Sequence, residues 1–290
     1  MLKRTALFSG SLLLSLGLAL AAPAAFAQTT PATPAAPAAS PQSAILAAAA
    51  VVPKPKSKAE VKALQNLQKM STSDTVTSDQ MDAALTNFAT QFPSSEYLGV
   101  VASYGLRFYQ TPPHQDYEKS LLYGEQTIQH EPVSVYALAT VSTIIAQHIS
   151  STDLDYAQRK AEAEKDANTA VAVANTVGAK INGVPFPDSA KSVARSMAYA
   201  ALAQLAVKDK DYGAAVNDYK QAVQNDPSPY SKASDYFYMA RAQIAGKQYA
   251  QALDSLNQAL QADPSDPNIQ AAVASNKKVV AELEKQGGGK

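Results

Sequence analysis

The chain has 290 residues, with 25 basic and 25 acidic side chains and neither cysteine nor tryptophan. The lack of cysteine excludes disulfides, thiolate metal sites and attachment of a lipid through cysteine, and it fits an exported bacterial protein. The basic residues are scattered and form no Arg-rich face with interleaved aromatic residues, so we expect no nucleic-acid partner.

The first 27 residues have the three parts of a secretory signal peptide. Lys3 and Arg4 form the charged start, residues 6–22 are apolar, and Ala25 and Ala27 are the small residues of a cleavage site. Serine and glycine interrupt the apolar run, and no later segment approaches eighteen apolar residues. We expect cleavage after Ala27, an exported (periplasmic or secreted) protein and no transmembrane segment in the mature chain. An uncleaved membrane anchor is the alternative.

Residues 28–58 consist mainly of alanine, proline, threonine, serine and lysine. Such a segment cannot bury a core, so we expect a disordered linker that acts as a flexible tether. Its simplest role is a spacer from the membrane or cell wall, and a binding motif is the alternative.

From residue 59 to 286, apolar side chains recur at helical spacing. Residues 87–93 end in a proline, as a helix that stops there would. Proline also closes a helical pattern at Pro132, whereas residues 134–178 contain a helix opening at Tyr156 and no closing proline.

A longer pattern then occurs twice, 37 residues apart. Its positions are Tyr199, Leu202, Ala203, Tyr212, Ala215, Tyr219, Ala222 and Pro227, then Tyr236, Met239, Ala240, Tyr249, Ala252, Leu256, Ala259 and Pro264. In the second copy, the last helix places its apolar residues at i, i+3, i+7 and i+10, which is one helix face. The turn at residues 246–248 separates it from the preceding helix.

This pattern resembles the tetratricopeptide repeat (TPR) family, in which each unit of two helices buries its apolar face against its neighbours. The resemblance implies an all-α protein, a right-handed α-solenoid of antiparallel helix pairs. The clearest repeats are 196–229 and 233–266, degenerate repeats lie at about 59–93, 95–132 and 134–178, and a capping helix covers 266–286. An ordinary helical bundle is the alternative.

Residues 178–187 interrupt the helical pattern with glycine and proline. We expect an inserted loop whose Ile181, Val184 and Phe186 pack on the preceding unit. A recognition loop is the alternative.

The sequence contains no pattern typical of a catalytic site. His114, His130 and His148 lie far apart, and no zinc-protease, nucleophile-elbow, dinucleotide or Walker motif occurs. We therefore expect neither enzymatic activity nor a cofactor or metal site.

The resemblance implies that a partner protein or peptide binds in the groove lined by the first helix of each repeat. The groove candidates are Met197, Ala200, Gln204, Val207 and Lys208 in one repeat and Ser234, Phe237, Arg241, Ile244 and Ala245 in the next. Phe237 follows the core residue Tyr236, and one residue turns a helix by about 100°, so Phe237 cannot share its direction. These positions could instead be merely solvated.

Three classes of function follow from these patterns. The first is a non-enzymatic protein-protein interaction scaffold or adaptor of the bacterial cell envelope. The alternative is a dedicated subunit of an outer-membrane or wall assembly complex. A helical enzyme or small-ligand receptor is the least favoured, because the sequence shows no convergent polar pocket.

Overall fold

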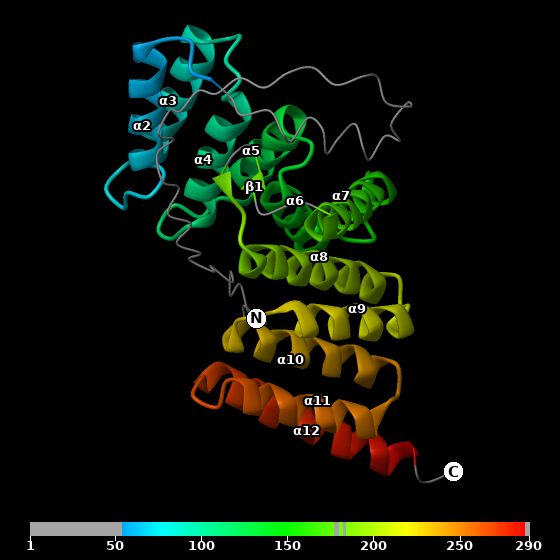
Figure 1. Cartoon of the computed structure of the whole chain (residues 1–290). Coiled ribbons are helices and arrows are strands. Elements are labelled where there is room, and N and C mark those ends of the chain that lie inside the picture. The colour runs from blue at the N-terminus through cyan, green and yellow to red at the C-terminus, as the bar shows by residue number, and fades with distance from the viewer. Residues whose placement is uncertain (1–53, 177–179, 182–183, 288–290) are drawn as a thin grey trace, which may run out of the picture.

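The computed structural model describes residues 54–176, 180–181 and 184–287 (Figure 1). The predicted signal peptide and most of the predicted linker therefore lie outside the described residues. Within them the chain is helical apart from one antiparallel ladder, in which β1 (Lys180–Ile181) pairs with β2 (Val184–Pro185). The predicted all-α class is confirmed. The ladder falls inside the segment predicted as an inserted loop, where Phe186 packs on the preceding helices as expected.

The N-terminal half of the described chain consists of helices joined by short turns. These are α2 (Lys58–Met70), α3 (Ser78–Gln91), α4 (Leu98–Gln110), α5 (Tyr117–His130), α6 (Val135–His148) and α7 (Tyr156–Thr176). Side chains define several of the starts: Ser57 caps α2, and Thr77 forms a reciprocal capping box with Gln80 at α3.

The last residues of the predicted linker are held against the α3–α4 turn. The backbone nitrogen of Lys54 donates to Glu96 Oε2 at 3.1 Å, and Lys56 Nζ donates to the carbonyl oxygen of Ser94. Glu60 of α2 is 1% exposed and accepts from Ser95 Oγ at 2.5 Å. Residues 54–58, the last of the predicted linker, thus contact the helical domain predicted to begin at residue 59.

The C-terminal half repeats one helix-turn-helix geometry. Its helices are α8 (Asp188–Lys208), α9 (Tyr212–Asn225), α10 (Pro229–Ala245), α11 (Tyr249–Ala262) and α12 (Pro267–Gly287). The tight turns before α9 and α11 place Lys210 at φ 63° and Lys247 at φ 60°, both in the left-handed region. These two residues are also 37 positions apart, so the backbone follows the sequence repeat.

Consecutive helices pack against each other along the chain, and Figure 1 shows α8 to α12 as stacked layers. The final helix, α12, packs against both α11 and α10. The arrangement of neighbouring helix pairs agrees with the predicted TPR-like solenoid. In the described part of the chain, no helix combines the length and apolar character needed to cross a membrane.

The region around α3 and α4 and the region from α8 to α11 differ in the side chains that they bury. Around α3, α4 and α6 the core contains large residues such as Phe88, Leu106, Phe108 and Ile145. From α8 to α11 many of the fully buried residues are alanines, and few are large. The short alanine side chains let the helices approach closely. The buried alanines of these helices include Ala203, Ala215, Ala222, Ala240, Ala252 and Ala259.

Candidate functional site

The predicted groove positions of α8 do not share one face: Met197 and Lys208 contact the preceding helices, whereas Ala200 and Val207 pack against the cluster of α8, α9 and α10. Met197 packs against the apolar cluster that includes α6 and α7, and its carbonyl oxygen lies 3.4 Å from Thr143 Oγ1. Lys208 Nζ donates to the carbonyl oxygen of Ile149 at 2.7 Å, at the end of α6. Ala200 and Gln204 lie between them and are partly buried. Met197 and Lys208 therefore tie α8 to α6.

The corresponding positions of α10 are only partly open to solvent. Phe237 and Ile244 pack against the apolar cluster formed by α10, α11 and α12, and Phe237 contacts the ring of Tyr238 edge-on at 5.6 Å. Arg241 is exposed. On α10 an exposed arginine thus lies four residues after a half-buried phenylalanine.

A cleft opens on a different face of α10, between α9 and α11. Tyr236, Met239 and Gln243 of α10 line it, and its volume is about 510 Å³. Both α9 and α11 pack against α10 rather than against each other, so a gap remains above α10. The lining residues of the two walls are Gly213, Val216, Asn217, Lys220, Val223 and Gln224 from α9 and Gln248, Gln251, Asp254, Ser255 and Gln258 from the α11 side.

Side-chain amides are frequent in the lining of the cleft between α9 and α11, which we call the amide-lined cleft. Asn217 and Gln224 belong to one wall, and Gln251 and Gln258 belong to the other. Gln243 is 4% exposed, and its Oε1 has no hydrogen-bond partner among the described residues. A buried acceptor without a partner is uncommon in proteins, so the Gln243 amide is an unsatisfied polar group at the floor of the cleft.

The walls also carry one charge each. Lys220 lies on α9 and Asp254 lies on α11, and neither forms an ion pair within the described part of the chain. The cleft could not be predicted from the sequence. The only sequence signal was the helical spacing of polar residues such as Asn217, Lys220 and Gln224, which is equally typical of a solvated face.

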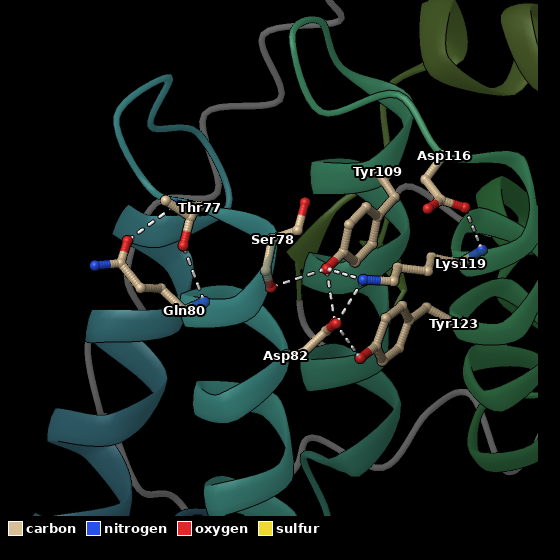
Figure 2. Close-up of polar contacts among 8 residues, drawn as sticks. All are labelled: Thr77, Ser78, Gln80, Asp82, Tyr109, Asp116, Lys119 and Tyr123. Atoms are coloured by element: carbon tan, nitrogen blue, oxygen red, sulfur yellow. Dashed lines mark hydrogen bonds and ion pairs between the residues drawn. The ribbon is translucent and has the colours of Figure 1, made fainter.

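A second polar cluster joins α3, α4 and α5 (Figure 2). Asp82 Oδ1 accepts hydrogen bonds from the hydroxyls of Tyr109 at 2.6 Å and Tyr123 at 2.9 Å, and Asp82 Oδ2 pairs with Lys119 Nζ at 2.7 Å. The two tyrosine rings are stacked with centroids 5.7 Å apart. Gly105 permits this arrangement, because a Cβ there would come within 2.7 Å of the Tyr123 ring.

The groups of this Asp82 cluster satisfy one another. Burial acts to raise the pKa of Asp82, but hydrogen bonds from Lys119, Tyr109 and Tyr123 outweigh it and lower that pKa below its usual value. Burial, together with the Asp82 carboxylate, raises the pKa of both tyrosine hydroxyls. We interpret the cluster as a tie between helices, because each polar atom already has its partner inside the protein.

The three histidines lie apart from one another. His114 stacks on Phe108 at 4.1 Å between centroids and His148 stacks on Tyr117 at 4.0 Å, while His130 is exposed. Among the residues that the structure describes, no group of three or more histidine, aspartate or glutamate side chains could hold a metal ion.

Comparison with known proteins agrees with the helical geometry. Residues 206–275 match a family model described as a tetratricopeptide repeat, and this segment runs from the end of α8 into α12. The match supports a TPR-type protein, and it contains α9, α10 and α11 in full. Repeats of this kind generally mediate protein–protein interactions. A comparison with curated protein sequences gave no match.

Proposed function

We propose that this protein is a non-enzymatic scaffold or adaptor that binds a segment of a partner protein in the bacterial cell envelope. The observation that carries the proposal is the match of residues 206–275 to the tetratricopeptide repeat, over helices that pack as neighbouring pairs. A stack of repeats offers a long surface on rigid helices, which suits the binding of another chain.

Within this proposal, Arg241 and Phe237 of α10 form the contact with the partner. Arg and aromatic side chains often carry much of the binding energy at interfaces, and these two residues lie one helical turn apart. Arg241 is exposed, so its removal should leave the fold intact. Phe237 packs on the α10–α12 cluster, so Phe237→Leu is preferable to Phe237→Ala because it keeps apolar volume there.

The test is crosslinking of the full-length protein in the native envelope, followed by identification of the crosslinked partners. We expect the Phe237→Leu, Arg241→Ala double variant to lose partners that the wild type captures while keeping its melting temperature. Lys278→Ala, which removes an exposed charge from α12, is the matched control. If the double variant captures every partner, this face does not bind them.

The proposed location rests on the signal-like N-terminus. We expect the intact mass of the exported protein to lack residues 1–27, and a full-length mass in the periplasm would contradict this. The alternative function, a dedicated subunit of an assembly complex, predicts that native-size fractionation finds the protein in one stable complex. A scaffold with exchangeable partners should instead be spread over several sizes.

A further inference from the structure

We infer that the amide-lined cleft between α9 and α11 binds an extended polypeptide segment. The site differs from the Phe237 and Arg241 face, because neither of those residues lines the cleft. The inference deepens the proposed function, since it takes from it only that the occupant is a protein segment.

The floor of the cleft contains a polar group that the protein leaves unsatisfied. Gln243 is 4% exposed and its Oε1 has no partner among the described residues. Burying an acceptor without a donor opposes folding, and such groups are few in native proteins. The preceding repeat has Ala206 at the matching position, so the amide is not a general requirement of the repeat. A backbone N–H of a bound segment would satisfy the oxygen once the Gln243 side chain rotates its amide toward the cleft.

The cleft has the length of a short extended peptide. On α9 the lining residues run from Gly213 to Gln224, which spans about 16 Å at the rise of an α-helix. On the other wall they run from Gln248 to Gln258, about 15 Å. An extended chain advances about 3.3 Å per residue, so the cleft accommodates about five residues.

The walls carry side chains that complement a peptide backbone. A carboxamide side chain carries one acceptor oxygen and an NH₂ donor, which together complement the N–H and C=O of a peptide group. An extended segment directs these groups toward both of its edges, and amides stand on both walls here. A sugar would be expected to stack on an aromatic ring. Tyr236, the aromatic residue in the lining, is instead packed against the apolar clusters on both sides of α10.

The charges on the walls define the preferred sequence. Lys220 and Asp254 stand on opposite walls without ion-pair partners in the described chain. Successive side chains of an extended segment point to opposite sides. The cleft should therefore favour a segment in which an acidic residue, directed to Lys220, is adjacent to a basic residue, directed to Asp254.

The probe is the acetylated and amidated hexapeptide Thr-Gln-Glu-Lys-Gln-Thr, titrated into the full-length protein with detection by calorimetry and backbone NMR. We expect saturable binding with shift changes concentrated on α9, α10 and α11. Gln243→Met should weaken binding at least tenfold, because it keeps the side-chain length but removes the amide. Gln261→Met, an exposed position of α11 outside the cleft, should have no effect.

Two further titrations separate peptide recognition from simple charge attraction. A version of the hexapeptide with N-methylated backbone amides should bind at least tenfold more weakly, although its side chains are the same. Lys220→Glu should weaken the Glu-Lys peptide and strengthen a Thr-Gln-Lys-Lys-Gln-Thr peptide, which a misfolded variant could not do.

Several results would overturn the inference. They are no binding at millimolar peptide, shifts outside the cleft, equal affinity for Gln243→Met, or tighter binding of chitotetraose than of peptide at the same residues. These outcomes are independent of the envelope crosslinking through Arg241. The cleft can fail while partners are still captured, and the peptide titration stays interpretable if no partner is captured.

Discussion

Asp82 in the N-terminal half and Asp235 in the C-terminal half both lie at helix interfaces, but their surroundings are opposite in kind. Asp82 meets one ammonium and two tyrosine hydroxyls. Asp235 of α10 is 8% exposed, and its one hydrogen bond to a described residue is a long one of 3.5 Å from Ser196 Oγ. No cation pairs with Asp235 within the described chain.

The pKa values of the two carboxyl groups are therefore shifted in opposite directions. Burial acts to raise the pKa of Asp82, and hydrogen bonds outweigh it, so that pKa is lowered. Burial raises the pKa of Asp235 well above its usual value, and the nearby carboxyl of Asp226 adds to the rise while the Ser196 hydroxyl opposes it. One carboxylate stabilises its interface when charged, whereas the other is tolerated best when neutral.

The comparison shows two ways of holding helices together. In the α3–α5 region, large aromatic side chains and completed polar contacts join three consecutive helices. In the α8–α11 region, alanines bring the backbones close together, and polar atoms such as Gln243 Oε1 and Asp226 Oδ2 are buried without a partner among the described residues. In the same described part of the chain, Glu131 and Thr140 of the N-terminal half also have buried atoms without a partner, whereas each polar group of the Asp82 cluster has one.

The largest loss of stability should come from placing a charged side chain among the buried alanines of the α8–α11 region. Ala259 is 0% exposed, so Ala259→Asp buries a carboxylate with no room and no partner. We expect a loss of several kcal/mol in the free energy of unfolding, measured by denaturant titration. Ala274→Asp, at an exposed position of α12, should cost less than about 1 kcal/mol. Similar losses for both variants would contradict the alanine packing.

Asp82→Asn should cause the next largest loss of stability. The variant loses the ion pair with Lys119 and replaces one carboxylate oxygen with an NH₂ donor, so we expect destabilisation of about 1–2 kcal/mol at pH 7. Because the folded pKa of Asp82 is lowered, its stabilisation is complete above the usual value near 3.9 and disappears as the pH falls through the folded pKa.

The difference between wild type and Asp82→Asn should thus be full above about pH 5 and shrink toward pH 2. Hydrogen exchange should assign the loss to α3, α4 and α5. The exposed Asp74→Asn is the control. A pH-independent difference would mean that the carboxylate charge does not matter.

The same substitution at Asp235 should change the free energy of unfolding in the opposite direction. Because its folded pKa is raised, ionisation opposes folding as the pH rises from about 4 through the folded pKa. Asp235→Asn removes this ionisation and keeps an acceptor for Ser196. We expect a gain of about 1 kcal/mol at pH 7 that vanishes near pH 3, measured by denaturant titration at both pH values. A loss of stability at pH 7 would show that the charged form of Asp235 has a function or partner of its own.

The smallest effect should occur where the two halves meet. Asp209, at the end of α8, accepts from the Tyr156 hydroxyl at 2.9 Å and pairs with Lys160 Nζ at 3.0 Å, both on α7. The carboxylate is largely exposed, so Asp209→Ala should cost only about 0.2–1 kcal/mol. Calorimetry at low and high salt checks this, because the difference should decrease with salt.

Much of the fold could be predicted from the sequence because it depends on short-range spacing. The repeat of 37 residues places the turn at residues 246–248 and the helix end before Pro264, and the structure has both. The contacts between distant segments could not be predicted in this way. Asp82 lies 27 residues from Tyr109 and 41 from Tyr123, and periodicity does not indicate which polar residues of two helices will meet.

The candidate sites could likewise be predicted only where they depend on the spacing within one helix. Arg241 is exposed as its helical position suggests, whereas Phe237 is half-buried because neighbouring helices supply an apolar cluster against it. The amide-lined cleft depends on the separation of α9 and α11 above α10, a quantity that the pattern of a single helix does not contain. The left-handed turns at Lys210 and Lys247 were also not anticipated, because neither residue is glycine.

The position of the amide-lined cleft has a mechanical consequence. Its walls are α9 and α11, which belong to successive repeats and are joined through α10. The width of the cleft is therefore set by the spacing between successive repeats in the stack. Bending the stack toward this side narrows the gap and bending it away widens the gap, so filling the cleft would also stiffen this stretch of the array against flexing.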